Sequence, residues 1–560
     1  MFSVWSLAGW AQVDFSSSNL PIVVINTDGA EIVDEPKINV AMGIIDNGPG
    51  QRNNVTDPFN DFEGSVGIEI RGSTSQRYPK KQYSVEVRNP LGQDSAVSLL
   101  GLPEESDWVL YAPYSDKSLM RNVLAYQLGR DLGRYAPRTK LCEVVLNGDY
   151  QGVYVLIEKI KRDKNRVDIA KLKDEDVSGE ELTGGYIIKI DKDNSRTEEQ
   201  WFSDYPPPYR DSTQRIPFRY VYPDEDDMAP EQKAYIQQYV KDFEDALAGD
   251  NFTDPEEGYA PYIDVGSFID LFIINEVSKD IDAYRLSTYM YKQKSTNGGK
   301  LVMGPLWDYN FSFGNVDYCV DTGPEGLALD FSKLCPGEFW LAPFWWERLL
   351  EDSAYTEQLA VRWAALRQDQ LATEQVMARI DSVATLLNAE AQQRNFTRWP
   401  ILGEFVWPNA FVGQTYQEEV DYLKDWTRQR LTWLDATFPT PTVATDTMPP
   451  DTVPPDTIVT SVTADEVPGA SSTAFPNPFD RELTLRFNLR QAGTVSVWLH
   501  DLLGRTVLRA SSFYSGGEQS LLVNTASLPT GLYVVRWQVR DGPLITRKMY
   551  KRSSPRSFAT

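Results

Sequence analysis

A stretch rich in threonine, proline and aspartate divides this chain of 560 residues into parts that must fold separately. Residues 439–469 read PTPTVATDTMPPDTVPPDTIVTSVTADEVPG, with few large apolar side chains to bury and prolines that keep the backbone extended. This composition predicts a linker between a large region, 19–438, and a small C-terminal region, 470–560; residues 1–18 form a separate N-terminal segment. The chain is too long to fold around one hydrophobic core of usual size, so at least two folded units are expected.

The large region changes character halfway along. Its first part contains short alternating runs typical of strands, such as GSVGIEIRG and KQYSVEVRN, and Asn147-Gly148 predicts a β-hairpin. Later runs have apolar residues at helical spacing. These runs are EQKAYIQQYVKDFEDALAG, YIDVGSFIDLFIINEVS, FWWERLLEDSAYTEQLAVRWAALRQ and YQEEVDYLKDWTRQRLTWLDATF. The order predicts the α+β class, with a β-rich lobe, a helix-rich lobe and a cleft between them. The alternating strands of 470–552 add a small all-β sandwich.

Histidine is nearly absent, which excludes several kinds of chemistry. The one histidine, His500, lies in the C-terminal region, where an ordinary surface role is expected. Ser-His-Asp hydrolases, Cys-His proteases and His-ligated zinc sites all need an imidazole. Chemistry in the large region must therefore use carboxylates, amines, hydroxyls or a metal bound through oxygen.

Charge and hydropathy exclude other partners. The chain carries 80 acidic and 55 basic residues, a net charge of −25. Such a surface repels nucleic acid and anionic lipid, so no nucleic-acid partner is expected. No run of about 18 uncharged apolar residues occurs, so no transmembrane segment is predicted. The first residues, MFSVWSLAGWAQ, have the apolar run and small residues of a signal peptide without its basic start, and we interpret them as the tail of one.

The three cysteines do not form a metal or redox motif, because no CxxC spacing occurs. Cys319 and Cys335 flank a Gly/Asp-rich loop, and either a disulfide in an oxidising compartment or two free thiols fits that spacing. Cys142 lies in an apolar strand-like run, which predicts a buried free thiol.

Two aspartates flank a predicted hairpin in the segment Asp280 to Asn315. Asp282 precedes the strand-like YRLSTYMYK, a Gly-Gly turn and KLVMGPLW follow, and then come Asp308 and Asn310. Because a hairpin returns its ends to one neighbourhood, the two carboxylates are expected to converge. One can accept a proton from a hydroxyl nucleophile, and the other can hold Mg²⁺ on nucleotide phosphates. As an alternative, Asp282 caps a turn and Asp308 is a buried residue that bonds loop amides.

Basic groups that can balance phosphate charge lie earlier, in IEIRGSTSQRYPKKQYSVEV. This run supplies Arg71, Arg77, Lys80 and Lys81 beside a Gly-Ser-Thr-Ser turn whose backbone amides suit an anion. Glu158, on the strand-like GVYVLIEKI, can pair with one of the lysines. The alternative is a solvated hairpin end with lysines at a sheet edge, and a solvated strand end at Glu158.

Four of these runs together resemble the CotH (spore-coat-protein-H-like) kinase family. They are RGSTSQRYPKKQYSVEV, GDYQGVYVLIEKI, DAYRLSTYMYK and GPLWDYNFSFGN, in the order and spacing of that family, and the resemblance covers roughly residues 20 to 438. Members of the family resemble divergent protein kinases, which bind ATP with a divalent metal and phosphorylate Ser or Thr of coat or surface proteins. The resemblance implies ATP and Mg²⁺ or Mn²⁺ as cofactors and an exported or surface protein as substrate.

The resemblance also assigns roles to the residues singled out above. Asp282 would be the catalytic aspartate, Asp308 would hold the metal, and Lys81 and Lys80 would contact the nucleotide phosphates with Glu158 as the acidic partner. From the residues themselves, Asn310 is a further candidate metal ligand and Arg71 a further candidate phosphate contact. Ser287 stands where some members carry an asparagine, and the chain has neither a Walker GxxxxGK[ST] nor a kinase GxGxxG motif. The resemblance therefore bears on the fold more directly than on activity.

The C-terminal region resembles the type A sorting domain of the type IX secretion system of Bacteroidetes. The resemblance rests on AFPNPFDRELTLRFNLRQAGTVSVWLHDLLGRTV, LPTGLYVVRWQV and the basic end RKMYKR. It implies the secretion machinery as a partner and a secreted or outer-surface location.

Three functions are open at this point. The first is an atypical Ser/Thr protein kinase acting on exported proteins. The second is a catalytically inactive kinase-like adhesin, in which aromatic residues of Trp340 to Trp346 could stack on sugars, although such residues more often pack between helices. The third, a polysaccharide hydrolase with paired carboxylates, is favoured only by abundant Asp, Glu and Trp.

Overall fold

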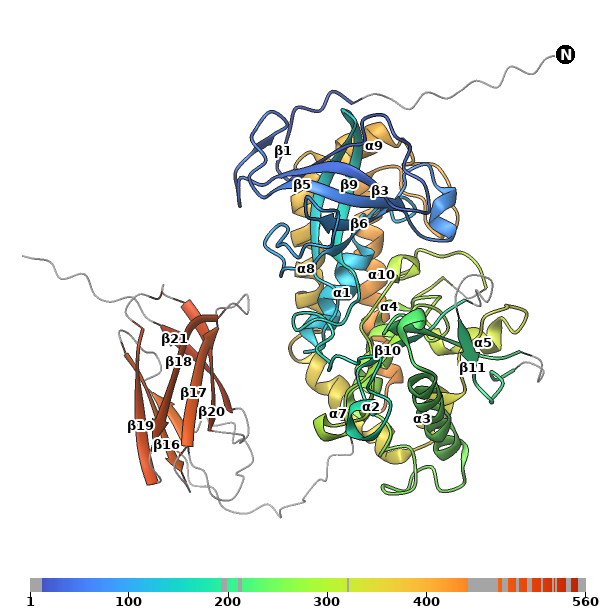
Figure 1. Ribbon diagram of the computed structural model, residues 1–560, viewed down its shortest axis with the longest axis vertical. Coiled ribbons are helices and arrows are strands. Elements are labelled where there is room, and N and C mark those ends of the chain that lie inside the picture. The colour runs from blue at the N-terminus through green and yellow to red at the C-terminus, as the bar shows by residue number, and fades with distance from the viewer. Residues whose placement is uncertain are drawn as a thin grey trace, which may run out of the picture. The chain divides into compact units, whose positions relative to one another are not determined.

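The structure is a computed structural model of the chain (Figure 1). It describes residues 13–192, 199–209, 214–319 and 322–441, and in the C-terminal region 472–475, 482–489, 493–500, 506–514, 517–525, 528, 531–539 and 545–551. The chain divides into two compact units, Met1–Thr445 and Asp446–Thr560. Most of the predicted signal peptide and nearly all of the predicted linker lie outside the described residues.

The first unit begins with a closed barrel. Its strands follow one another in the order β2-β3-β5-β6-β7-β9-β8, and all neighbours are antiparallel except β2 and β8, whose parallel pairing closes the barrel. The strands are β2 (Ile22–Asn26), β3 (Ile38–Ile45), β5 (Phe62–Ile70), β6 (Tyr83–Arg88), β7 (Asp107–Tyr111), β8 (Thr139–Leu146) and β9 (Asp149–Glu158). The short strands β1 (Ser17–Ser18) and β4 (Asn53–Asn54) pair beside it. Alternating Val, Ile and Leu side chains fill its interior, as the period-two pattern predicts.

The hairpin predicted at Asn147-Gly148 is confirmed. Leu146 pairs with Asp149, so two residues connect β8 to β9. Asn147 and Gly148 have φ of 51° and 81°, the conformation that two-residue hairpin turns require and that asparagine and glycine adopt most readily.

The second part of the unit combines a sheet with helices. The sheet order is β11-β12-β10-β13-β14, from β11 (Gln200–Phe202), β12 (Pro217–Tyr222), β10 (Tyr186–Ile190), β13 (Thr288–Lys292) and β14 (Leu301–Met303). β13 and β14 pair antiparallel, so the hairpin predicted between Asp282 and Asp308 is also confirmed. The barrel and this sheet lie toward opposite ends of the unit in Figure 1.

Helices connect and cover these sheets. They are α1 (Arg121–Asp131), α2 (Gly179–Leu182), α3 (Pro230–Ala248), α4 (Val265–Ser278), α5 (Phe331–Leu334), α6 (Trp345–Leu350), α7 (Ser353–Arg367), α8 (Thr373–Asn388), α9 (Ala391–Arg398) and α10 (Tyr416–Thr437). Helix α9 packs on β9 of the barrel (Figure 1). The α+β class is thus confirmed, with a β-rich N-terminal part and a helical middle part.

The helical runs match the predictions with one difference. The run from 344 to 368 forms two helices, α6 and α7, because Asp352 interrupts it. The Asp352 carboxylate accepts a hydrogen bond of 2.8 Å from the Ala354 amide and so caps the second helix. Trp345 and Trp346 are fully buried in the core, which is the packing role left open above.

The described residues of the second unit form two antiparallel sheets. The sheet β15-β16-β19 contains β15 (Ser472–Phe475), β16 (Glu482–Leu489) and β19 (Gly517–Asn524). The sheet β18-β17-β20-β21 contains β17 (Gly493–His500), β18 (Thr506–Tyr514), β20 (Gly531–Val539) and β21 (Ile545–Lys551). Buried side chains of both sheets form one hydrophobic cluster, with Trp537 fully buried in it.

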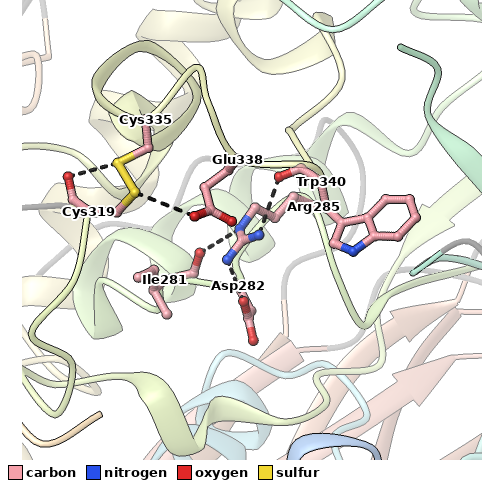
Figure 2. Close-up of a disulfide and its surroundings, with 7 residues drawn as sticks. All are labelled: Ile281, Asp282, Arg285, Cys319, Cys335, Glu338 and Trp340. Atoms are coloured by element: carbon pink, nitrogen blue, oxygen red, sulfur yellow. Dashed lines mark hydrogen bonds and ion pairs between the residues drawn. A yellow bond between two sulfur atoms is a disulfide. The ribbon is translucent and has the colours of Figure 1, made fainter. Parts of the chain in front are cut away.

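The cysteines divide as one disulfide and one free thiol. Cys319 and Cys335 are bonded, with Cα atoms 5.7 Å apart, which resolves the alternative left open by their spacing (Figure 2). Cys142 is free and buried, as predicted. Among the described residues, no helix is long and apolar enough to cross a membrane.

Candidate active site

A pocket in the first unit lies where the barrel meets the helical part. Its volume is about 100 Å³, and Tyr111 of β7 and Ile157 of β9 contribute the barrel wall. Asn122 of α1 and the segment after β14 form the opposite wall. A second pocket of about 410 Å³ shares part of this lining and extends along the sheet that contains β10, β12 and β13. The residues common to both pockets are Arg71, Ser73, Lys192, Asp282, Trp307 and Asp308.

Asp282 lies in the turn that follows helix α4. The helix ends at Lys279, whose left-handed φ of 44° breaks the helical path. Two hydrogen bonds to the Asp282 carbonyl, from the amides of Arg285 (3.3 Å) and Leu286 (3.0 Å), form the turn. The Asp282 side chain is 20% exposed, and its Oδ1 accepts a bond of 2.6 Å from Arg285. The alternative prediction, that Asp282 only forms a turn, is therefore correct for its backbone carbonyl. Its carboxylate, however, lines the pocket.

Asp308 follows β14 and also has a left-handed backbone, with φ 64° and ψ 52°. Its amide donates a 3.0 Å hydrogen bond to the hydroxyl of Tyr126 on α1. Asn310 lies two residues further, and its carboxamide nitrogen donates to Asp308 Oδ1 at 2.8 Å in the orientation that satisfies both groups. The hairpin therefore brings Asp282, Asp308 and Asn310 to one pocket.

The carboxylates at this site interact strongly. Burial and the neighbouring Asp282 raise the pKa of Asp308 to about 6, and Arg71 opposes the shift. Burial, Asp282 and Asp308 also raise the pKa of Asp280 well above its ordinary value. Asp280 is buried, and its Oδ1 has no hydrogen-bond partner among the described residues. Three carboxylates with like charges close to one another, one of them buried, favour the binding of a cation in the pocket.

Arg71 and the loop after β5 form the cationic side of the pocket. The Arg71 guanidinium lies 5.3 Å from the centre of the Trp307 ring. Gly72 has φ 100°, and a Cβ atom there would lie 2.0 Å from Ser75 Oγ, so glycine is required at this close approach. The short 3₁₀ turn η1 (Thr74–Arg77) follows, and residues 72–75 line the pocket.

The structure does not bring Lys80 into the pocket. Its side chain is buried at the contact between β9 and α9, where Nζ donates to the Val153 carbonyl (2.5 Å) and to Asn395 Oδ1 (2.8 Å). Lys80 thus links the barrel to a helix more than 300 residues later and does not line either pocket.

Lys81 and Glu158 do not form the predicted pair. Lys81 Nζ donates to the Gln76 carbonyl at 2.6 Å. Glu158 is fully buried and bonds Arg138 through both the guanidinium (2.8 Å) and the backbone amide (2.9 Å). The arginine reaches Glu158 because it lies directly before β8 and beside the end of β9, where the Glu158 amide donates to the Arg138 carbonyl at 3.2 Å. Lys81 and Glu158 are therefore structural neighbours of the pocket and not part of its lining in this structure.

Several lining residues carried no signal in the sequence. Asn122 and Tyr126 lie one turn apart on α1, a helix that the pattern did not predict. Asn122 is buried, and its Oδ1 has no hydrogen-bond partner in the described part of the chain. Asp191 and Lys192, directly after β10, line the second pocket. Asp191 is the last residue of the predicted strand GGYIIKID, and nothing in that run indicates that Asp191 or Lys192 lies at a pocket.

The residues present fit a divalent metal bound together with phosphate groups. Among the described residues, no three His, Cys, Asp or Glu side chains are grouped as a metal site formed by protein alone. Mg²⁺ typically takes one or two carboxylates and completes its shell with phosphate oxygens and water. Asp308 supplies a carboxylate ligand of that kind. Asp280, whose pKa is raised by the charge of Asp308 and whose Oδ1 has no hydrogen-bond partner among the described residues, supplies a second.

The first unit is an α+β unit with paired carboxylates and an arginine at one pocket, which suits binding of phosphate with a metal, and a separate β unit follows it. Comparison with known families agrees, since the family model described as CotH kinase protein matches residues 68–434. The chain belongs to this family. The chain is also 30% identical to the inner spore coat protein H of Bacillus subtilis (strain 168) over 95 residues, which are 17% of this chain and 24% of that protein. The match thus spans about a quarter of the curated relative's length.

The C-terminal unit matches a second family model, described as a secretion system C-terminal sorting domain, over residues 473–552. This match confirms the predicted sorting domain. It indicates export by the type IX secretion system to the cell surface or the medium.

Proposed function

We propose that the chain is an exported protein kinase with a divergent two-lobed kinase-like domain. It transfers the γ-phosphate of ATP to Ser or Thr hydroxyls of exported or surface proteins. The observation that carries the proposal is that Asp282, Asp308 and Arg71 line one pocket between the barrel and the helical part. In this reading the barrel is the N-terminal lobe and the helical part is the C-terminal lobe.

Asp282 is the proposed general base. Arg285 occupies its Oδ1, so Oδ2 is left to accept the proton of an acceptor hydroxyl. A carboxylate in that position orients the hydroxyl for in-line attack on the γ-phosphorus. Such positioned proton acceptors contribute about 10²–10⁴-fold to rate.

Asp308 is the proposed metal ligand. Its left-handed backbone and its amide bond to Tyr126 direct the carboxylate into the pocket, and Asn310 bonds one carboxylate oxygen. A bound Mg²⁺ or Mn²⁺ would neutralise charge on the phosphate oxygens. Arg71 and the amides of residues 72–75 supply the remaining positive potential toward the phosphates.

The test is phosphate transfer by the full chain. Purified protein with Mg²⁺ or Mn²⁺, γ-labelled ATP and dephosphorylated casein as a general acceptor should incorporate label, and Asp282→Asn and Asp308→Asn should each lose at least about 10²-fold of the rate. Asp381→Asn, on the exposed face of α8, is the matched control and should retain it. A wild-type protein that binds no nucleotide at millimolar metal would instead favour a non-catalytic surface-binding role.

A further inference from the structure

Arg285 connects the proposed base to the disulfide. We propose that Arg285 is a positioning residue for Asp282 and that the Cys319–Cys335 bond holds Arg285 in place, so that oxidation of this cysteine pair completes the active site. The inference rests on the proposed role of Asp282. It adds a residue and a covalent requirement that the family resemblance did not supply.

The guanidinium of Arg285 is held on every side. Nη2 donates to Asp282 Oδ1 (2.6 Å), Nε to the Ile281 carbonyl (2.8 Å) and Nη1 to the Trp340 carbonyl (3.3 Å). Its Cζ atom lies 4.0 Å from the centre of the Phe331 ring. The side chain is 3% exposed. In Figure 2 it lies between Asp282 on one side and Glu338 and the disulfide on the other.

Two of the groups that contact Arg285, Phe331 and Ile281, pack with a cysteine of the disulfide. Phe331 and Cys335 are the two ends of one helical turn, in which the Cys335 amide donates to the Phe331 carbonyl at 2.8 Å. Cys335 Sγ is bonded to Cys319 and lies 2.8 Å from the Cys319 carbonyl oxygen. Ile281, Phe331 and Cys335 are buried in one small hydrophobic cluster. The bond therefore ties the wall around Arg285 to the segment that carries Tyr318 and Cys319.

The Asp282 turn needs such support because its own backbone is unusual. Lys279, Tyr284 and Ser287 have φ of 44°, 68° and 46°, values that non-glycine residues adopt at a cost. A turn of this kind persists only when its surroundings determine it. Arg285 joins the turn, through Ile281 and Asp282, to Phe331 of the disulfide-linked wall, beside the direct packing of Ile281 there.

The covalent step is ordinary disulfide formation. The thiols of Cys319 and Cys335 lose two protons and two electrons as their S–S bond forms. The acceptor is a protein disulfide of the exported compartment, whose S–S bond breaks and which leaves as a dithiol. Because the sorting domain directs the chain out of the cell, the site is completed where disulfides persist, and the reduced precursor lacks a positioned base.

The first test measures transfer kinetics with the full chain. Cys319→Ser/Cys335→Ser, or reduction of wild type with dithiothreitol, should lower kcat at least tenfold. The KM for ATP and the Kd for Mn·ATP should change less than twofold, since Asp308 is untouched. Dithiothreitol should have no further effect on the double variant, which separates this bond from the free thiol of Cys142. Unchanged kcat in the double variant would overturn the proposal.

Arg285 variants separate positioning from folding. Arg285→Gln should lower kcat at least tenfold, and Arg285→Lys, which keeps the charge, should restore part of it. Combining Arg285→Gln with the cysteine variants should add little to the loss, because both act through one contact. Losses that multiply independently would contradict the coupling.

A second readout does not depend on transfer activity. Hydrogen exchange in peptides covering residues 279–288 should rise when the disulfide is removed, while barrel peptides from β2 to β9 stay unchanged. Equal protection of 279–288 in both forms would overturn the proposal even if the wild-type chain transfers no phosphate. An inactive wild type with the expected exchange change would reject the proposed function and leave the structural link intact.

Discussion

The backbone amide of Asp308 donates its hydrogen bond to the hydroxyl of Tyr126, 182 residues earlier on helix α1. This bond fixes the left-handed residue that carries the proposed metal-binding carboxylate. Helix α1 also carries Asn122 in the pocket lining, so one helix supports both the position of Asp308 and the wall opposite the barrel.

Tyr126→Phe should therefore affect catalysis more than folding. Losing the hydroxyl removes the acceptor of the Asp308 amide in a part-buried hydrogen bond, which costs about 1 kcal/mol of stability and frees the carboxylate to move. We expect kcat to fall about tenfold, since small misplacements of reacting groups are costly. Tyr259→Phe is the matched control: its hydroxyl bonds Asp352 at 2.6 Å outside the lining of either pocket, so it should lose stability without losing kcat.

Glu158→Gln tests whether this residue is structural. Glutamine cannot satisfy both donors of Arg138, so the free energy of unfolding should fall by about 1–2 kcal/mol. The KM for ATP should stay within about twofold, because Glu158 does not line the pocket. Urea unfolding and steady-state kinetics measure the two quantities. A KM raised tenfold with unchanged stability would restore the role that the sequence resemblance assigned to it.

Lys80→Met makes the corresponding test for the buried lysine. Burial lowers the pKa of Lys80 to about 7. Methionine keeps most of the volume but removes the amine that donates to the buried Val153 carbonyl and Asn395 Oδ1, so the free energy of unfolding should fall by about 1–3 kcal/mol. ATP titration should give an unchanged KM; a large increase would place Lys80 at the nucleotide.

Glu244 predicts a pH dependence of stability. Burial raises its pKa from 4.5 to about 7, although Ser203 and Trp345 donate hydrogen bonds to it. Between pH 4.5 and 7 Glu244 is therefore protonated in the folded state and ionised in the unfolded state. The free energy of unfolding falls as the pH rises through this range. Glu244→Gln should abolish this dependence and be more stable than wild type by about 2–3 kcal/mol at pH 8. Identical pH profiles for the two proteins would show that Glu244 does not titrate in this range.

Sequence patterns predicted the parts of this fold that are determined by residues close together in the chain. The hairpin at Asn147-Gly148 follows from backbone preferences of two residues, and the hairpin between Asp282 and Asp308 follows from two short strands and a glycine turn. The second hairpin placed three of the predicted site residues at one pocket without any knowledge of the rest of the chain.

Contacts between distant parts of the chain decided the rest. Parallel pairing of β2 with β8 closes the barrel, and nothing in the alternation of either strand indicates its partner. The charge of Lys80 and the family resemblance predict a phosphate contact, but its amine donates to Val153 and to Asn395 of α9 in the core. The charge of Glu158 predicts a lysine partner. In the structure its partner is Arg138, which nothing in the sequence indicated.

The most direct measurement of the central claim is equilibrium binding of Mn·ATP to the full chain and to two single variants. If Asp308 holds the metal and Asp282 serves as base, wild type and Asp282→Asn should bind Mn·ATP with similar Kd, and Asp308→Asn should bind at least about tenfold more weakly. Equal binding by all three proteins, or no binding by any of them, would contradict the account.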